Sequence, residues 1–92
     1  MMRLNVPHEI AELIHGMHPA LKKKVRFGLE RILSRHSEGK LLRFELEDLW
    51  SFRIGSFRII YRLQKDYLEI VAIGPRARIY EETYRLIKKH EG

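Results

Sequence analysis

The chain has 92 residues, 45% of them hydrophobic, and its 18 lysines and arginines against 12 acidic residues give a net charge of +6. This length allows one domain, residues 1–92, with a modest core, and the hydrophobic content excludes a disordered chain. The absence of cysteine excludes disulfides and thiolate metal sites, while the basic charge favours a nucleic acid or an acidic protein as partner.

The first part of the chain predicts a short strand followed by two helices. Apolar and polar residues alternate over residues 2–6, which is the period of a strand. Pro7 suits the first turn of a helix, and apolar residues then recur at helical spacing as far as Met17. Pro19 begins a longer helix, and Gly39 ends the helical region. The inward stripe of this longer helix is expected to comprise Leu21, Val25, Gly28, Leu29, Ile32 and His36, widened by Phe27 and Leu33.

A β-hairpin is predicted in the middle of the chain. From Leu49 the apolar period changes to two, and Gly55-Ser56 interrupts it. A two-residue connection with glycine first is typical of a type II′ turn. This turn places Arg53 opposite Arg58 on one face of the hairpin. The other face is wholly apolar and is expected to lie under the two helices; it carries Trp50, Phe52, Ile54, Phe57, Ile59 and Tyr61.

A third strand and a last helix complete the predicted fold. The strand is expected from Tyr67 to Ile73, where Gly74-Pro75 breaks it, and the helix is expected over residues 79–90. The order is a short N-terminal strand, a two-helix hairpin, a three-strand antiparallel meander and a C-terminal helix, which makes an α+β domain. The expected strand pairs are Leu63 with Leu68, Arg62 with Glu69, Tyr61 with Ile70 and Ile59 with Ala72, and they place Arg58 beside Ile73.

The facing arginines predict an anion site. Like charges directly opposite each other on adjacent strands cost on the order of 0.2–1 kcal/mol, so a bound anion is expected to offset the repulsion between Arg53 and Arg58. After the third strand, Arg76 or Arg78 can fold back over the same place, together with Tyr80. Guanidinium groups suit a phosphate, because each offers fork-shaped donors and a permanent charge. The alternative interpretation is that these arginines are solvated surface charges.

The run from Leu49 to Arg62, together with that from Ile73 to Tyr80, resembles the core of the RelE/ParE superfamily of toxins from type II toxin–antitoxin systems. The string Trp-Ser-x-Arg-Ile-Gly-x-x-Arg-Ile-Ile-Tyr is its most specific part. The resemblance implies a RelE/ParE-like fold, a cognate antitoxin as partner and no cofactor. In RelE-like members such a domain enters the ribosomal A site and cuts messenger RNA there, so we expect a ribosome-dependent mRNA endoribonuclease that inhibits translation.

The same resemblance implies roles for four residues. Arg58 resembles the arginine that stabilises charge on the scissile phosphate, and Arg76 resembles the one that assists the leaving 5′-oxygen. Arg53 matches a basic residue on the preceding strand, and Tyr80 resembles a tyrosine on which a base stacks. Attack by the ribose 2′-hydroxyl on the adjacent phosphate would then cut the RNA, with the arginines acting electrostatically.

The chain departs from the RelE pattern at two positions. Ser51 stands where some members have a lysine, and the region of Lys40 is basic where others have a carboxylate. No conventional general base is therefore visible, because arginine stays protonated. Two alternatives remain open: a ParE-like poison of DNA gyrase, and a catalytically decayed module that only binds an antitoxin.

Other polar residues complete the expectations. Lysines and an arginine of the second helix either touch ribosomal RNA through its phosphates or form a solvated face; they are Lys22, Lys23, Lys24 and Arg26, and Arg78 is a further candidate. The acids Glu45, Glu47 and Asp48 are interpreted as a solvated approach to the strand rather than a paired-carboxylate site. No metal is expected, because no metal-ligand spacing joins an acid to His8, His15, His18, His36 or His90.

The chain carries no sign of export or membrane insertion. Residues 1–13 mix charged and apolar side chains, without the uninterrupted apolar core of a signal peptide. The longest apolar stretches, such as Ile70 to Ile73, are too short to span a membrane. We therefore expect a cytoplasmic protein with no membrane partner.

Overall fold

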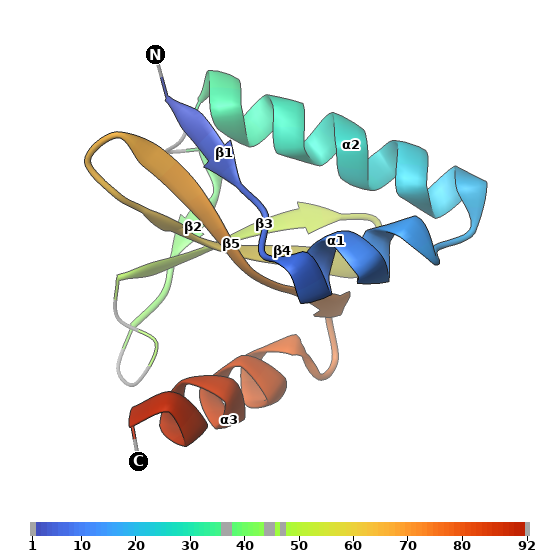
Figure 1. Ribbon diagram of the computed structural model, residues 1–92. Coiled ribbons are helices and arrows are strands. Elements are labelled where there is room, and N and C mark those ends of the chain that lie inside the picture. The colour runs from blue at the N-terminus through green and yellow to red at the C-terminus, as the bar shows by residue number, and fades with distance from the viewer. Residues whose placement is uncertain (1, 36–37, 44–45, 47, 92) are drawn as a thin grey trace.

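The computed structural model describes residues 2–35, 38–43, 46 and 48–91. It is an α+β domain in which a mixed sheet lies between two helical layers, with α1 and α2 on one face and α3 on the other (Figure 1). The helices are α1 (His8–His15), α2 (Pro19–Ser34) and α3 (Ile79–Glu91). The strands are β1 (Arg3–Asn5), β2 (Lys40–Leu41), β3 (Leu49–Ile54), β4 (Phe57–Leu63) and β5 (Tyr67–Pro75). The α+β class and the order of the main elements are confirmed.

The sheet has five strands in the order β1-β5-β4-β3-β2. The first strand joins the same sheet and pairs parallel to β5. The strand β2 was not predicted; it pairs antiparallel with β3 and puts Lys40 opposite Ser51. The sheet therefore holds the predicted meander at its centre and a short strand at either edge.

The β3–β4 hairpin has the predicted register. Gly55 has a φ of +63°, as the first central residue of a type II′ turn requires. Arg53 lies opposite Arg58, and Phe52 lies opposite Ile59. The two-residue turn thus determines which side chains share each face of the sheet.

The β4–β5 pairing differs from the prediction because β5 contains a bulge. The expected register holds from Leu63 as far as Tyr61, and the ion pair between Arg62 and Glu69 forms at 3.2 Å. The register then shifts, since Val71 is an extra residue on β5. The shift turns Ile73 into the core, and the strand continues through Gly74 to Pro75. Two predicted pairs are therefore wrong: Ile59 pairs with Ile73 rather than Ala72, and Arg58 pairs with Gly74 rather than Ile73.

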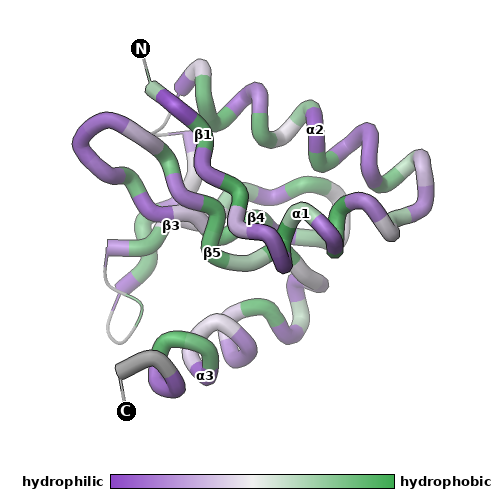
Figure 2. Tube along the Cα trace, in the orientation of Figure 1, coloured by the Kyte–Doolittle hydropathy of each residue, from purple (hydrophilic) through white to green (hydrophobic). Residues whose placement is uncertain are grey.

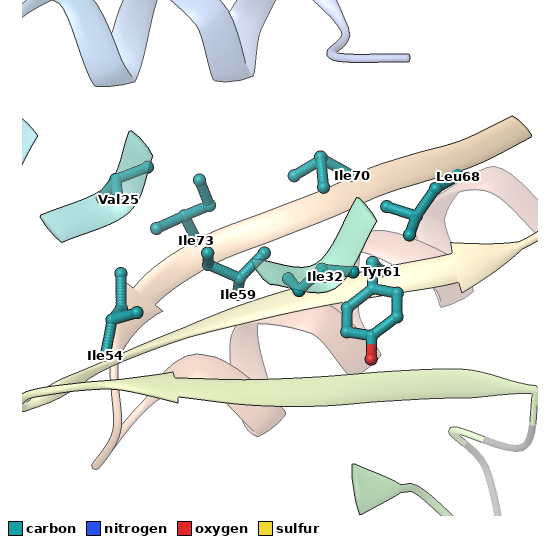
Figure 3. Packing of buried hydrophobic residues seen from close by; sticks show 8 residues of the cluster. All are labelled: Val25, Ile32, Ile54, Ile59, Tyr61, Leu68, Ile70 and Ile73. Atoms are coloured by element: carbon teal, nitrogen blue, oxygen red, sulfur yellow. The ribbon is translucent and has the colours of Figure 1, made fainter. Parts of the chain in front are cut away.

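The main core lies between the sheet and helices α1 and α2 (Figure 3). Gly28 lets α2 approach the sheet, because a Cβ there would lie 2.8 Å from Ile54 Cγ2 and 3.1 Å from Ile59 Cδ1. The predicted apolar face of the hairpin packs here, as expected. The buried members of this cluster are Val25, Ile32, Ile54, Ile59, Tyr61, Leu68, Ile70 and Ile73.

Two expectations for α2 are wrong. Phe27 does not widen the inward stripe but is 62% exposed, because the stripe centred on Val25 and Gly28 already fills the contact with the sheet. The helix ends at Ser34 rather than at Gly39. Gly39 instead donates its backbone N–H to Tyr61 Oη at 3.2 Å, which ties the segment before β2 to the core. His36, the last residue of the expected stripe, lies outside the described residues.

The opposite face of the sheet has a smaller core of its own, which sequence patterning treated as a non-core face. Leu49 and Ile60 are buried there against Ile79 at the start of α3. Hydrophobic residues recur along α3 between hydrophilic ones, as expected of a helix with one face on a sheet (Figure 2). The arginine-bearing face is therefore half covered, and α3 forms one wall of the region around Arg58. None of the helices in the described ranges is long and apolar enough to cross a membrane.

Candidate anion site on the sheet

Arg58 is held in a defined position on the face of the sheet that α3 covers. Its Nη1 donates a hydrogen bond of 3.0 Å to Ser51 Oγ on the neighbouring strand. Its guanidinium carbon lies 5.9 Å from the centre of the Tyr80 ring, which α3 supplies. Its Nε is buried and has no hydrogen-bond partner among the described residues. The guanidinium is thus oriented by two neutral groups, and no carboxylate of the described residues forms an ion pair with it.

Ser51 is the centre of this arrangement, and sequence reasoning missed its role. The side chain is 1% exposed, and its hydroxyl also forms a hydrogen bond of 3.2 Å with Tyr80 Oη. Sequence reasoning treated the position only as a missing lysine. The alternation of β3 does place Ser51 on the same face as Arg53, and this was the signal that could have identified it.

Arg53 and Arg76 meet at an open hollow of about 550 Å³ next to the β3–β4 turn. The Arg53 Nε donates to the backbone oxygen of Gly55 at 3.2 Å, which bends the side chain toward the turn. The Arg76 backbone N–H donates to the Ser56 oxygen at 2.8 Å and fastens the segment after β5 to the same turn. Both arginines are exposed. Arg58 lies directly opposite Arg53 but is not among the residues that line this hollow.

The four arginines of this region have no carboxylate partner among the described residues; they are Arg53, Arg58, Arg76 and Arg78. On the same face of the sheet, Arg62 is neutralised by Glu69 at 3.2 Å. The cationic region is therefore confined to the end of the sheet beside the β3–β4 turn. A phosphate would supply the missing negative charge.

Glu82 is a carboxylate that sequence reasoning did not connect with this region. Its Oε2 lies 3.7 Å from the position that a Cβ would take on Gly74, and Gly74 is the strand partner of Arg58. A Cβ on Gly74 would also lie 2.9 Å from Ile79 Cδ1, so the glycine allows α3 to lie close to the sheet. The bulge at Val71 and the packing of α3 together bring Glu82 to this place, and neither has a marker in the sequence.

The basic residues of α2 are divided between two surfaces. Lys23 and Lys24 line a hollow that continues to Arg53, whereas Lys22 and Arg26 line a groove between α2 and α1. These four residues therefore do not form one face. Arg78 is exposed at the start of α3, and its backbone N–H donates to the Pro75 oxygen at 3.0 Å.

The histidines and acids that were considered for metal binding lie apart. His18 caps α2, accepting a bond of 3.2 Å from the Ala20 backbone N–H, and His8 lies 3.1 Å from Glu12 on exposed helix. Asp48 occupies a turn with a φ of 75°. In the described part of the chain no three acidic or histidine side chains gather closely enough to hold a metal ion. Glu45, Glu47, His36 and the side chain of His90 lie outside the described residues.

Comparison with known proteins gives one family match. The model of a family described as the ParE toxin of the type II toxin–antitoxin system parDE matches residues 8–80. No curated protein sequence matches the chain.

Several solved structures share the fold. The toxin–antitoxin complex RelBE2 from Mycobacterium tuberculosis contains a chain that is 26% identical, with a TM-score of 0.69 over 83% of this chain and 92% of the other. A mutant of the Escherichia coli toxin RelE in the free state gives a TM-score of 0.72 at 15% identity, over 94% and 97%. YafQ from Escherichia coli gives 0.64 at 13% identity, over 87% and 99%. The match spans nearly the full length of each of these chains.

Proposed function

Since the chain belongs to the ParE toxin family of type II toxin–antitoxin systems, we propose that this toxin cleaves messenger RNA on the ribosome and so inhibits translation in the cytoplasm. The proposal rests on the arginines at the end of the sheet. Arg58 is oriented by Ser51 and Tyr80, faces Arg53 and has no carboxylate partner among the described residues. A phosphodiester would offset the repulsion between Arg53 and Arg58, and phosphoryl transfer depends mainly on positioned positive charge.

In the proposed reaction the ribose 2′-hydroxyl attacks the adjacent phosphorus, and the bond to the 5′-oxygen of the next nucleotide breaks. A cyclic 2′,3′-phosphate remains on one product. Arg58 stabilises the charge that develops on the phosphate, with Arg53 beside it, and Arg76 stabilises the leaving 5′-oxygen, which takes a proton from water. Arginine cannot accept the proton of the 2′-hydroxyl.

We assign the general base to Glu82. Its carboxylate lies above Gly74, the strand partner of Arg58, so one group could remove a proton while the other holds the phosphate. Tyr80 keeps its ring beside the Arg58 guanidinium, where a base of the RNA could also stack. This arrangement would supply the general base that the RelE-type positions lack here.

The partners follow from the same proposal. Solved structures with this fold include complexes of a toxin with its antitoxin, so we expect a cognate antitoxin for this chain. We expect the cations of α2 and Arg78 to contact ribosomal RNA through its phosphates. The test is primer extension on an mRNA that is being translated in a purified system, with and without the toxin. Breaks confined to the ribosomal A site support the proposal, and intact mRNA contradicts it.

A second candidate, a poison of DNA gyrase, is favoured by the match to the ParE toxin family. It requires binding to a protein rather than RNA chemistry. A gyrase supercoiling assay run beside the primer extension separates the two. Inhibited supercoiling with intact mRNA would replace the first proposal by the second.

A further inference from the structure

Phe27 is an exposed aromatic side chain with cations on either side. It lies on the outer part of α2 and is 62% exposed, the largest exposed fraction of any large hydrophobic residue described. Lys23 is one helical turn before it and Lys24 three residues before it, so both lie on the same side of the helix. Single exposed hydrophobic side chains are common on protein surfaces, so the meaning of Phe27 depends on the charged and aromatic groups that surround it.

The ring borders a hollow of about 540 Å³ between α2 and the β3–β4 turn. Lys23, Lys24 and Arg53 contribute the charged part of its lining, and Phe27 and Phe52 contribute the aromatic part. None of the described residues that line it is acidic. The hollow thus combines aromatic surface with three positive charges, which fits an anionic ligand that also carries flat rings.

This hollow is continuous with the candidate anion site. Arg53 and Gly55 line both this hollow and the one that Arg76 borders. Lys24 Nζ lies 3.9 Å from the position of a Cβ on Gly55, so its ammonium group stands over the turn between the two hollows. A continuous row of positively charged side chains therefore extends from Lys24, beside Phe27 on α2, through Arg53 to Arg76 beyond the end of β5.

We propose that the hollow beside Phe27 is a subsite for a nucleotide of single-stranded RNA, next to the segment whose phosphate is cut. The base stacks on the Phe27 ring, and the flanking phosphates bind Lys24 and Arg53. Aromatic rings with interleaved cations are the general means of binding single strands, because every base has a face to stack and every linkage has a charge. The three cations favour RNA over an apolar protein segment. The choice of RNA rests on the proposed ribonuclease function.

The test measures binding apart from cleavage. The probe is a short fluorescently labelled single-stranded RNA with methylated 2′-hydroxyls, which cannot be cut, and anisotropy is followed at several salt concentrations. F27A is expected to weaken binding by roughly 5- to 150-fold without changing the salt dependence, and F27W should restore it. K24A should instead reduce the slope of log affinity against log salt by about 0.7.

The matched control is L13A, which removes another exposed apolar side chain, 47% exposed on α1, and should bind as wild type does. All variants should melt as wild type does, because these side chains lie outside the core. Wild-type RNA affinity in F27A overturns the inference, and so does a loss confined to binding of a protein partner. If F27A weakens RNA binding but translated mRNA stays intact even with wild type, the cleavage proposal fails and the RNA subsite stands.

Discussion

Replacing Arg58 with alanine is expected to separate the stability of the domain from its activity. The substitution removes the hydrogen bond to Ser51, and a bond from a charged donor contributes about 1.5–3 kcal/mol. The substitution also removes two unfavourable contributions. The buried Nε without a partner among the described residues destabilises wild type by about 1–3 kcal/mol, and the repulsion from Arg53 destabilises it by about 0.2–1 kcal/mol. At the midpoints of these ranges the contributions nearly offset each other, so the free energy of unfolding should change by no more than about 1 kcal/mol.

The rate of cleavage should respond very differently. If Arg58 stabilises the transition-state charge, its loss should lower the rate on the order of 100-fold, as the loss of one oxyanion donor does. The assay compares the thermal midpoint with A-site cleavage of a translated mRNA. R62A is the matched control: it removes the same charge from the same strand and face, but from a partly exposed pair with Glu69. It should cleave normally and lose only about 0–1 kcal/mol of stability.

Two results would refute this reasoning. One is an R58A protein that melts more than about 8 °C below wild type, since about 1 kcal/mol corresponds to a shift of at most that size in a domain of this length. The other is equal cleavage by R58A and wild type, which would remove Arg58 from the site.

Three further predictions concern other parts of the chain. E82Q should lower the rate of cleavage about 100-fold or more, whereas E81Q, which breaks only a surface ion pair, should cleave at the wild-type rate; equal rates for E82Q and wild type would exclude Glu82 as the base. Burial raises the pKa of Tyr61 from 10 to about 12, so the unfolded state loses this proton first and wild type should lose about 2–3 kcal/mol between pH 10 and 12. The free energy of unfolding of Y61F, measured with urea between pH 10 and 12, should not show this loss of stability. G28A should destabilise by about 1 kcal/mol or more, because its methyl group would meet Ile54 at 2.8 Å and overpacking outweighs the gain in helix propensity; an unchanged or raised thermal midpoint would contradict the close approach of α2.

The hairpin and its faces could be predicted from the sequence because their causes are local. Gly55-Ser56 sets the pairing of β3 with β4, and alternation then assigns each side chain to a face. The opposition of Arg53 and Arg58 followed directly from this. The same logic failed at Val71, because a one-residue bulge preserves the apolar character of β5 while it shifts every pair beyond it.

The rest of the site depends on contacts between elements that are distant in the chain. Glu82 reaches Gly74 only because α3 returns across the sheet, and Ser51 is buried only because Tyr80 covers it. The exposure of Phe27 depends on the rotation of α2 about its axis. A helical pattern determines that rotation only to within the width of its apolar stripe, so a residue at the edge of the stripe can lie on either side.

The parallel pairing of β1 with β5 affects the order in which the toxin can assemble during its own synthesis. The inner strand β5 is the last strand to be made, so Arg3–Asn5 has no partner until Tyr67–Glu69 has been translated. Tyr80 and Glu82 follow later still, on α3. Because Tyr80 and Glu82 are translated after Arg58, a growing chain carries an incomplete site until α3 has been made.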